Sequence, residues 1–306
     1  MAYKKKYSAE EKAVYKEQKQ AEIDEMIKQI DEGVKAVFNS ERYKEYLRFA
    51  SNFTNYSPNN TMLISLQRPT ATLVASYGKW RKVGRQVMKG ETGIAIFAPI
   101  IYKTNQYVKS EKNDNETEET SEEQYKRIAF KKVYVYDISQ TDGKDIPDFE
   151  GDELKGNIDP KKKKAIFTAL ERITGIKIEI SDIKGNAKGY YEPIEDRIVI
   201  KSGMSDNQTL KTAFHETAHK LLHDPKSEMA TVKSSRNEKE VQAESVAFMV
   251  AEKLGMDTSE YSFPYIASWS NGKQLVQLKS ALQEIQSVAM RILDEIEKFI
   301  EYFGVG

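Results

Sequence analysis

HETAHKLLH, residues 215–223, contains all three histidines of this 306-residue chain. The surrounding pattern predicts a helix from Ser205 to Asp224. On a helix, positions four apart differ by about 40° around the axis and about 6 Å along it. His215 and His219 should therefore present their rings on one face, where two imidazoles can bind one metal ion.

Glu216 follows the first of these histidines. At that offset a carboxylate can hold a water beside the metal without binding the metal itself, which is the role of the base in H-E-x-x-H peptidases. We therefore predict a Zn²⁺ site in which Glu216 is the catalytic base of peptide-bond hydrolysis. Two alternatives are a surface helix with coincidental histidines and a metal site without catalytic activity.

His223 does not fit as a third ligand. It lies about 12 Å along the predicted helix from His215, whereas ligands of one metal ion are only about 3–4 Å apart. We expect His223 to contact a ligand residue or to have a structural role, without binding the metal ion itself.

A tetrahedral zinc site open to water still needs a third protein ligand. The stretch NEKEVQAESVAFMVAEKLG (237–255) offers Glu240 and Glu244 one helical turn apart, with Ala243 and Ala247 allowing close helix packing. We choose Glu240 as the ligand because a glutamate followed by an acid four residues later resembles the pattern of gluzincin peptidases. Glu244 should then orient a ligand histidine, and it is the reserve ligand.

The overall pattern predicts an α+β fold with two domains. We expect an N-terminal helical arm at 1–38, a first domain at 39–150 and a second at 155–306. Helices are predicted at 8–38, 41–53, 59–67, 76–84, 160–175, 205–224, 237–254 and 272–303, and strands at 93–102, 127–139, 176–181, 187–192 and 196–201.

Composition restricts the location and the chemistry. The chain has no cysteine, which excludes disulfides and thiolate nucleophiles and agrees with a reducing compartment. The N-terminus is charged throughout, unlike a secretory signal, and no apolar run approaches the roughly 20 residues needed to span a bilayer. We expect a cytoplasmic protein without membrane contact.

The zero net charge hides an asymmetry. Residues 42–103 hold ten Lys or Arg against Glu45 and Glu91. Residues 104–124 hold seven acids against Lys109 and Lys112, in a polar composition that predicts a disordered acidic loop.

In the basic segment, aromatic and amide side chains alternate with cations. Cations that follow phosphates, beside rings that stack on unpaired bases, are typical of single-stranded DNA binding. The alternative is a basic globular domain with ordinary buried rings. The predicted DNA-binding residues are Tyr56, Asn60, Lys79, Trp80, Arg81, Lys82, Arg85 and Lys89.

NFTNYSPNNTMLISLQRPTATLVASYGKWRKVGRQVMKGETGIAIFAP (52–99) and VYVYDISQTDGK (133–144) resemble the N-terminal single-stranded-DNA-binding domain of ArdC-like antirestriction proteins, including LtrC-type proteins of conjugative elements. The half from HETAH onward is similar to the ImmA/IrrE-like zincin metallopeptidase domain that accompanies it. The resemblance covers roughly residues 40 to 300. The acidic insertion 104–124 departs from it and the arm 1–38 lies outside it.

The resemblance implies a mobile-element protein that binds single-stranded DNA and protects incoming DNA from restriction. It assigns Trp80, Arg81, Gly84, Arg85, Lys89 and Gly90 to the DNA-binding module and His215, Glu216, His219 and Glu240 to the metal site.

Three functions remain open at this point. The first is a DNA-localised zinc peptidase that acts on a restriction or regulatory protein. The second is a non-catalytic protein that coats single-stranded DNA and carries a structural or vestigial metal site. The third is an ImmA-like peptidase that cleaves a repressor.

Overall fold

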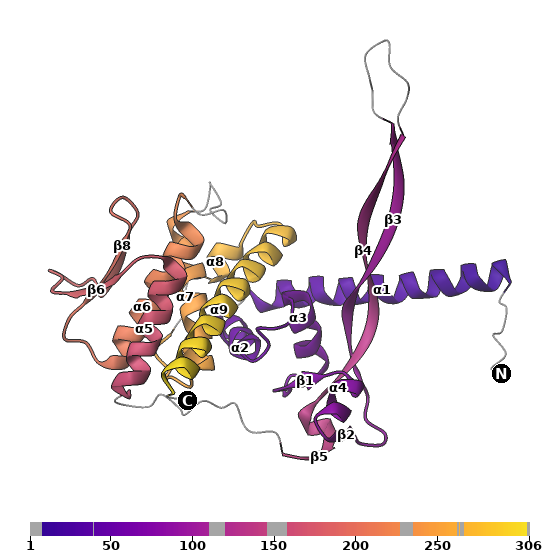
Figure 1. The fold of residues 1–306 in the computed structure, drawn as a ribbon, viewed down its shortest axis with the longest axis horizontal. Coiled ribbons are helices and arrows are strands. Elements are labelled where there is room, and N and C mark those ends of the chain that lie inside the picture. The colour runs from indigo at the N-terminus through magenta and orange to yellow at the C-terminus, as the bar shows by residue number, and fades with distance from the viewer. Residues whose placement is uncertain are drawn as a thin grey trace, which may run out of the picture.

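Helices and strands are mixed along the chain, in agreement with the predicted α+β class (Figure 1). The structure is a computed structural model that describes residues 8–38, 40–109, 120–145, 158–226, 235–261, 263 and 266–304. Within these ranges no helix is long and apolar enough to cross a membrane.

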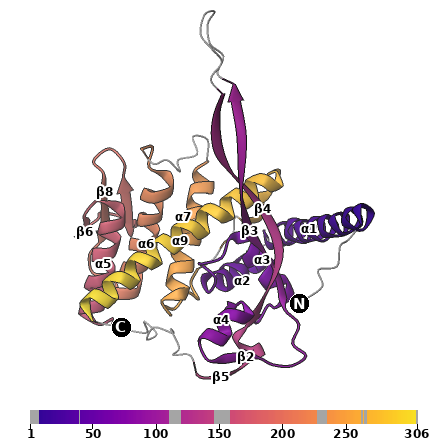
Figure 2. The same cartoon turned by 45° about the vertical axis from the view of Figure 1, so that its right-hand side comes forward.

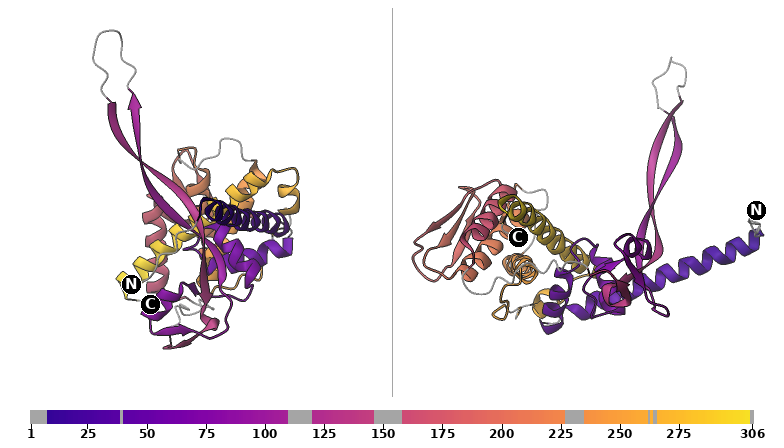
Figure 3. Two further views of the ribbon diagram at one scale, coloured as in Figure 1. Left: turned by 90° about the vertical axis from the view of Figure 1, so that its right-hand side faces the viewer. Right: turned by 60° about the horizontal axis from the view of Figure 1, so that its bottom comes forward.

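Helix α1 (Ala9–Val37) confirms the predicted N-terminal helix and its capping box. The Ser8 hydroxyl accepts the backbone N–H of Glu11 at 3.1 Å, and the Glu11 carboxylate accepts the N–H of Ser8 at 2.7 Å. The last turns bury Met26, Ile30 and Val34. The first turns are exposed and extend away from the rest of the molecule (Figures 1 and 3).

Short elements follow α1 and confirm the predicted helices of this region. They are α2 (Ser40–Ser51), α3 (Pro58–Gln67), β1 (Val74–Ala75), α4 (Tyr77–Lys82), β2 (Arg85–Val87), the 3₁₀ turn η1 (Ile138–Gln140) and β5 (Thr141–Gly143). The strands β1, β2 and β5 were not predicted, because two or three residues cannot display an alternating pattern. β1 pairs with the end of β4, and β2 pairs with β5.

A long antiparallel hairpin is formed by β3 (Ile94–Lys109) and β4 (Thr120–Asp137). It projects from the body of the molecule in every view (Figures 1, 2 and 3). The pairing runs from Ile94 opposite Val135 to Lys109 opposite Thr120.

The prediction of a disordered loop over 104–124 is therefore wrong at both ends. Residues 104–109 and 120–124 continue the two strands. Their backbone groups find partners across the ladder, and this local pairing outweighs the polar composition. The part between them, 110–119, lies outside the described residues.

The second half combines a small sheet with helices. Its elements are α5 (Pro160–Thr174), β6 (Ile178–Ser181), β7 (Gly189–Glu192), β8 (Arg197–Lys201), α6 (Asp206–His223), α7 (Arg236–Lys253), α8 (Ile266–Ser270) and α9 (Leu275–Phe303). The sheet order is β6-β8-β7, with β8 parallel to β6 and antiparallel to β7. β7 therefore lies at an edge of this sheet, and among the described residues no strand pairs with its outer side.

The predicted ends of α5 are also confirmed. The Asp159 carboxylate accepts the backbone N–H groups of Lys161 and Lys162. Gly175 ends the helix in the left-handed conformation with φ of 73°, where a Cβ would be strained.

Buried apolar side chains of both halves belong to one hydrophobic cluster, from Met26 in α1 to Ile296 in α9. Helix α9 contacts α5 and α7 as well as α1 and α3. Its Gln286 donates from Nε2 to the carbonyl oxygens of Phe53 at 3.0 Å and Tyr56 at 2.8 Å. The expected boundary between two domains falls in 146–157, outside the described residues, and the division stays a prediction.

Gly189 allows β7 to approach α6 closely. A Cβ built at Gly189 would lie 2.6 Å from Cγ2 of Thr212 in α6 and 3.0 Å from the carbonyl oxygen of Val199 in β8. Both distances are shorter than a normal contact between carbon and a neighbouring atom. The absence of a side chain at Gly189 thus sets the distance between the edge strand and the helix that carries the histidines.

We predict that Gly189→Ala destabilises the protein by about 1–3 kcal/mol, the usual cost of an overpacked contact. Urea unfolding of the two proteins measures this difference. Gly78→Ala is the matched control, because its added Cβ meets nothing within 4 Å and φ of Gly78 is not positive. Equal stability of the two variants would contradict the close approach.

Candidate metal centre

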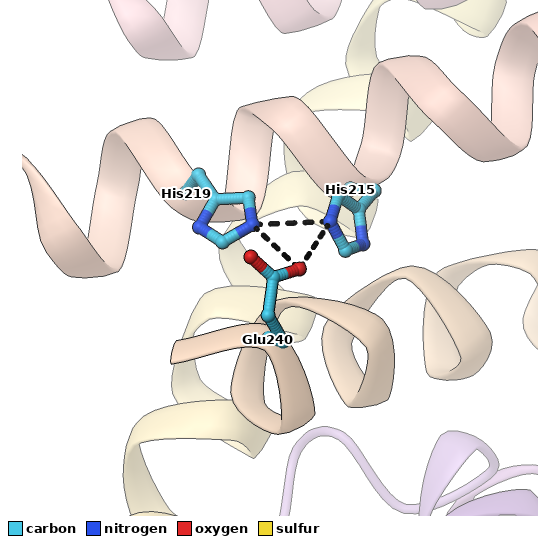
Figure 4. Close-up of side chains that lie close together, drawn as sticks. All are labelled: His215, His219 and Glu240. Carbon is cyan, nitrogen blue, oxygen red and sulfur yellow. Dashed lines mark hydrogen bonds and ion pairs between the residues drawn. The ribbon is translucent and has the colours of Figure 1, made fainter. Parts of the chain in front are cut away.

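Helices α6 and α7 pack against each other and carry the candidate ligands. His215 and His219 project from α6 toward Glu240 of α7 (Figure 4). Fully buried alanines on the same faces permit a close approach: Ala218 on α6, and Ala243 and Ala247 on α7. Residues far apart in sequence thus converge.

The three ligand atoms lie at distances suitable for one metal ion. Nε2 of His215 is 3.0 Å from Nε2 of His219, and Oε2 of Glu240 is 3.4 Å and 3.6 Å from these two nitrogens. Atoms bonded at about 2.0–2.1 Å to a tetrahedral ion are separated by about 3.3 Å. Among the described residues, this is the group of three that could hold a metal ion.

The two acids of α7 shift the pKa of the first histidine. Burial lowers the pKa of His215, but hydrogen bonds to Glu240 and Glu244 outweigh it and raise the pKa to about 10. The pKa of Glu240 is lowered, first by its hydrogen bond from His215 and then by that from His219. A divalent cation between the two Nε2 atoms and Oε2 of Glu240 would satisfy all three atoms.

Glu244 lies behind the first ligand. Its Oε2 is 3.1 Å from Nδ1 of His215. A proton on Nδ1 donated to this carboxylate leaves the Nε2 lone pair of His215 facing Glu240. This contact is the one that the predicted orienting role requires, and Oε2 of Glu240 lies on the Nε2 side of His215 at 3.4 Å. Both roles stay predictions.

His223 lies behind the second ligand, where a hydrogen-bond chain fixes the tautomers. Gln242 donates from Nε2 to Glu284 of α9 at 2.9 Å, so its Oε1 must accept from Nε2 of His223 at 3.0 Å. His223 Nδ1 then accepts from Nδ1 of His219 at 3.0 Å, which leaves the Nε2 lone pair of His219 free for a metal ion. Burial lowers the pKa of His223 to about 4, consistent with a neutral ring.

Glu216 is separate from the ligand group and 92% buried, with 8% of its surface exposed. Burial raises the pKa of its carboxyl group. Two hollows, of about 410 Å³ and 660 Å³, share Gly189, His215 and Glu216 in their walls. The carboxylate therefore borders open space on both sides of His215, next to the edge strand β7.

Half of the predicted DNA-binding side chains have internal partners. Asn60 pairs with both backbone groups of Phe97 at 2.9 Å. The Arg85 guanidinium donates to Thr141 and to the carbonyl oxygen of Lys144.

Two aromatic candidates are similarly engaged. The Tyr56 hydroxyl donates to the Val74 carbonyl oxygen at 2.9 Å. Trp80 is only 2% exposed and donates to the Tyr136 carbonyl oxygen at 2.8 Å. The ring of Trp80 is therefore buried in this conformation, and its part in DNA binding stays a prediction.

The remaining predicted residues form an exposed cationic group on α4 and on the turn that follows β2. They are Lys79, Arg81, Lys82 and Lys89. A hollow of about 590 Å³ lies beside them, lined by Arg81 and Lys89 together with the strands β2 and β5. We define these four residues as the α4 basic face.

Several residues of both sites carry no recognisable signal in the sequence. Gln242 accepts a hydrogen bond from His223, and Glu284 in turn accepts one from Gln242. No sequence motif links these residues, because they are far apart along the chain. Phe130 and Tyr134 are exposed aromatic rings in the basic half. Phe130 and Tyr134 follow the acidic insertion and lie outside the basic segment on which the prediction rested.

Comparisons with known proteins show a similarity in the first half. Residues 16–136 match the family model of the N-terminal domain of the anti-restriction factor ArdC, so this part of the chain is ArdC-like. An uncharacterized protein of Bacillus anthracis is 29% identical over 97% of this chain and 54% of its own length. The chain thus spans about half the length of this curated relative.

Two solved structures are similar to this chain. They are crystal structures of the antirestriction protein ArdC from plasmid R388, one metal-free and one with Mn(II) bound. Their sequence identities are 22% and 20%, and their TM-scores are 0.49 and 0.48. They cover 81% and 80% of this chain, and 86% of the ArdC chain in each case.

The geometry predicts different losses for Glu240 and Glu244 of α7. Glu244→Gln should weaken zinc binding by about 10- to 100-fold, as for other outer partners of a ligand histidine, and Glu240→Gln should weaken it further. Competition with a chelator measures both affinities. Glu238→Gln is the matched control, because Glu238 pairs with Lys273 at 2.8 Å rather than with a histidine. A larger loss in Glu244→Gln would exchange the two assignments.

Proposed function

We propose that this protein is an antirestriction protein that binds single-stranded DNA through its basic half and hydrolyses peptide bonds at a zinc centre. The observation that carries the peptidase part is the approach of the His215, His219 and Glu240 ligand atoms to 3.0–3.6 Å. The ArdC-like N-terminal segment supports the antirestriction part.

The donor set supports zinc. Two imidazole nitrogens and one carboxylate oxygen are ligands typical of a catalytic zinc site with one open position. Imidazole and carboxylate also suit other divalent cations, and metal analysis of the purified protein decides between zinc and manganese.

The residues around the ligands supply the proton transfers. A bound divalent cation would lower the pKa of a coordinated water and polarise a substrate carbonyl group. Glu216 would take a proton from the attacking water on its carboxylate and return it to the leaving amine. Its burial suits both steps, since a raised pKa brings the group closer to neutral pH.

The edge strand β7 provides a way to hold the substrate. Its outer side has no strand neighbour in the described sheet, and its residues line the 660 Å³ hollow with His215 and His219. An extended peptide could pair its backbone with this edge and cross the metal centre. We expect a restriction or regulatory protein in the cytoplasm as the substrate.

The α4 basic face supports the DNA-binding part of the proposal. Lys79, Arg81, Lys82 and Lys89 are exposed, and nearby Tyr77 adds an exposed ring. Exposed cations bind phosphates by releasing counterions, and exposed rings stack on unpaired bases.

Glu216→Gln tests the peptidase part. The variant should retain zinc and single-stranded DNA binding but lose protection of plasmid DNA transferred into a restricting host, because the amide cannot take a proton. Metal analysis and transfer frequency are measured on the same variant. Glu179→Gln, an exposed change on β6, is the control.

Unchanged protection by Glu216→Gln would reject catalysis and favour a protein that only coats the transferred strand. Release of a defined fragment from a repressor of the same element, lost in Glu216→Gln, would instead identify a repressor-cleaving peptidase.

A double charge reversal tests the DNA-binding part. Arg81→Glu with Lys82→Glu should weaken binding of a labelled single-stranded oligonucleotide at least about tenfold and reduce the slope against log salt by about 1.4. Fluorescence anisotropy at several salt concentrations gives both values. Lys177→Glu with Lys184→Glu, both exposed in the other half, carries the same change of net charge. An equal loss in this control, or equal wild-type affinity for duplex DNA, would reject the α4 basic face.

A further inference from the structure

The two outer edges of the β3–β4 hairpin differ in how their backbone groups are satisfied. On β3, side-chain amides of α3 cover the edge. Gln67 pairs with both backbone groups of Ala95 at 2.9 Å, as Asn60 does with those of Phe97. Pro99, the next residue of β3 that faces outward, has no N–H group to offer. This edge is therefore protected against the addition of another strand.

The pairing also determines which backbone groups of β4 face outward. In an antiparallel ladder, the backbone groups of two opposite residues either bond to each other or both point away. Ala95 and Phe97 point away from β4, so their partners Tyr134 and Lys132 point away from β3. By alternation, the backbone groups of Phe130 do the same.

Only the end of this second edge is covered. The carbonyl oxygen of Tyr136 accepts a hydrogen bond from Nε1 of Trp80 at 2.8 Å, and β1 pairs with Tyr136 and Asp137. Among the described residues, no strand pairs with the outer side of 128–134, and no backbone hydrogen bond reaches it from outside the ladder. This part of the hairpin projects from the body of the molecule (Figures 1 and 2).

Exposed apolar side chains follow this open edge on one face of the hairpin. Ile128 is 64% exposed, Phe130 57% and Tyr134 51%. Ile101 of β3, opposite Ile128, is 63% exposed and extends the same face. An open edge with alternating apolar side chains is where a further strand can add. Bases stacked on the rings would leave this backbone edge unpaired.

The charge of the hairpin selects the kind of strand. Residues 94–104 and 125–136 contain no acid. A second copy of this edge would bring like charges together, whereas an acidic strand would meet opposite charges. The cations of these two stretches are Lys103, Lys126, Arg127, Lys131 and Lys132.

We propose that the outer edge of β4 from Ile128 to Tyr134 is a docking site for an extended acidic segment of a partner protein, which adds to the hairpin as a further strand. The backbone groups of Phe130 and Lys132 pair with this segment. Its apolar side chains pack on Phe130 and Tyr134, and its acids lie beside Lys131, which is exposed on the opposite face. Backbone pairing supplies the affinity, and the side-chain pattern supplies the specificity. The site requires neither the metal ion nor DNA.

A short fluorescein-labelled peptide in which glutamate alternates with valine tests the site on the full-length protein. Fluorescence anisotropy measures its affinity. The same peptide methylated on every backbone nitrogen should bind at least about tenfold more weakly, because it cannot donate hydrogen bonds to the edge. Equal affinity of the two peptides, or binding of neither, overturns the proposal.

Phe130→Pro tests the edge from the side of the protein. Proline removes an N–H group that points outward and leaves the ladder with β3 intact, as Pro99 does at the opposite position. Phe130→Ala is the matched control, because it loses the same ring but keeps the N–H group. Phe130→Pro should bind the unmethylated peptide severalfold more weakly than Phe130→Ala. Equal affinity in the two variants overturns strand addition.

Lys131→Glu tests the preference for acids. Lys132 already has an ion pair with Glu22 at 3.6 Å, so Lys131 is the better choice. Lys131→Glu should weaken peptide binding severalfold. Lys177→Glu, an exposed change on the other half with the same change of net charge, is the control. Equal losses in these two variants overturn the recognition of acids.

Two other occupants would give different results. A wild-type dimer in sedimentation that dissociates in Phe130→Pro would assign the edge to a second copy of the chain. Single-stranded DNA that displaces the peptide competitively and binds more weakly to Phe130→Ala would assign this face to DNA. Either result overturns the proposal of a protein partner.

Discussion

The crossing of α6 and α7 is the constraint on which the metal centre depends. His215 and His219 are one turn apart on a single helix, so their separation follows from helix geometry. Glu240 reaches them only because α7 packs closely enough against α6. Fully buried alanines on both helices make this approach possible. The site is therefore a property of helix packing as much as of the residues that form it.

Hydrogen bonds behind the ligands then determine which atoms face the centre. The pair of His215 and Glu244 and the chain from His219 through His223 and Gln242 direct both Nε2 atoms to one point. The second chain ends on Glu284 of α9. The proton positions at the centre are thus connected to the helix that closes the hydrophobic core.

Local signals in the sequence predicted the elements with strong end markers. Ser8 with Glu11 and Asp159-Pro160 with Gly175 define helix ends through contacts within a few residues. The spacing of His215, Glu216 and His219 likewise requires only one regular helix. Glu240 could be chosen because it shares one turn with Glu244.

Properties that depend on distant partners were not predictable. Asn60 and Arg85 have residue types suited to DNA, but the hairpin and β5 take up their polar groups. The acidic composition of 104–124 predicted disorder, but residues 104–109 and 120–124 belong to a strand ladder. Backbone hydrogen bonds between strands form whatever side chains the residues carry.

The shared core links the stabilities of the two ends of the molecule. Tyr43 and Phe38 of the first half pack on Phe263 and Trp269 of the second, with ring centroids 5.2 Å and 5.1 Å apart. The Tyr43 hydroxyl also bonds to Ser245 of α7 at 2.8 Å. A fragment limited to residues 16–136 would leave these rings in water. In the intact chain, a ligand held at either end adds its binding free energy to the cost of unfolding the whole.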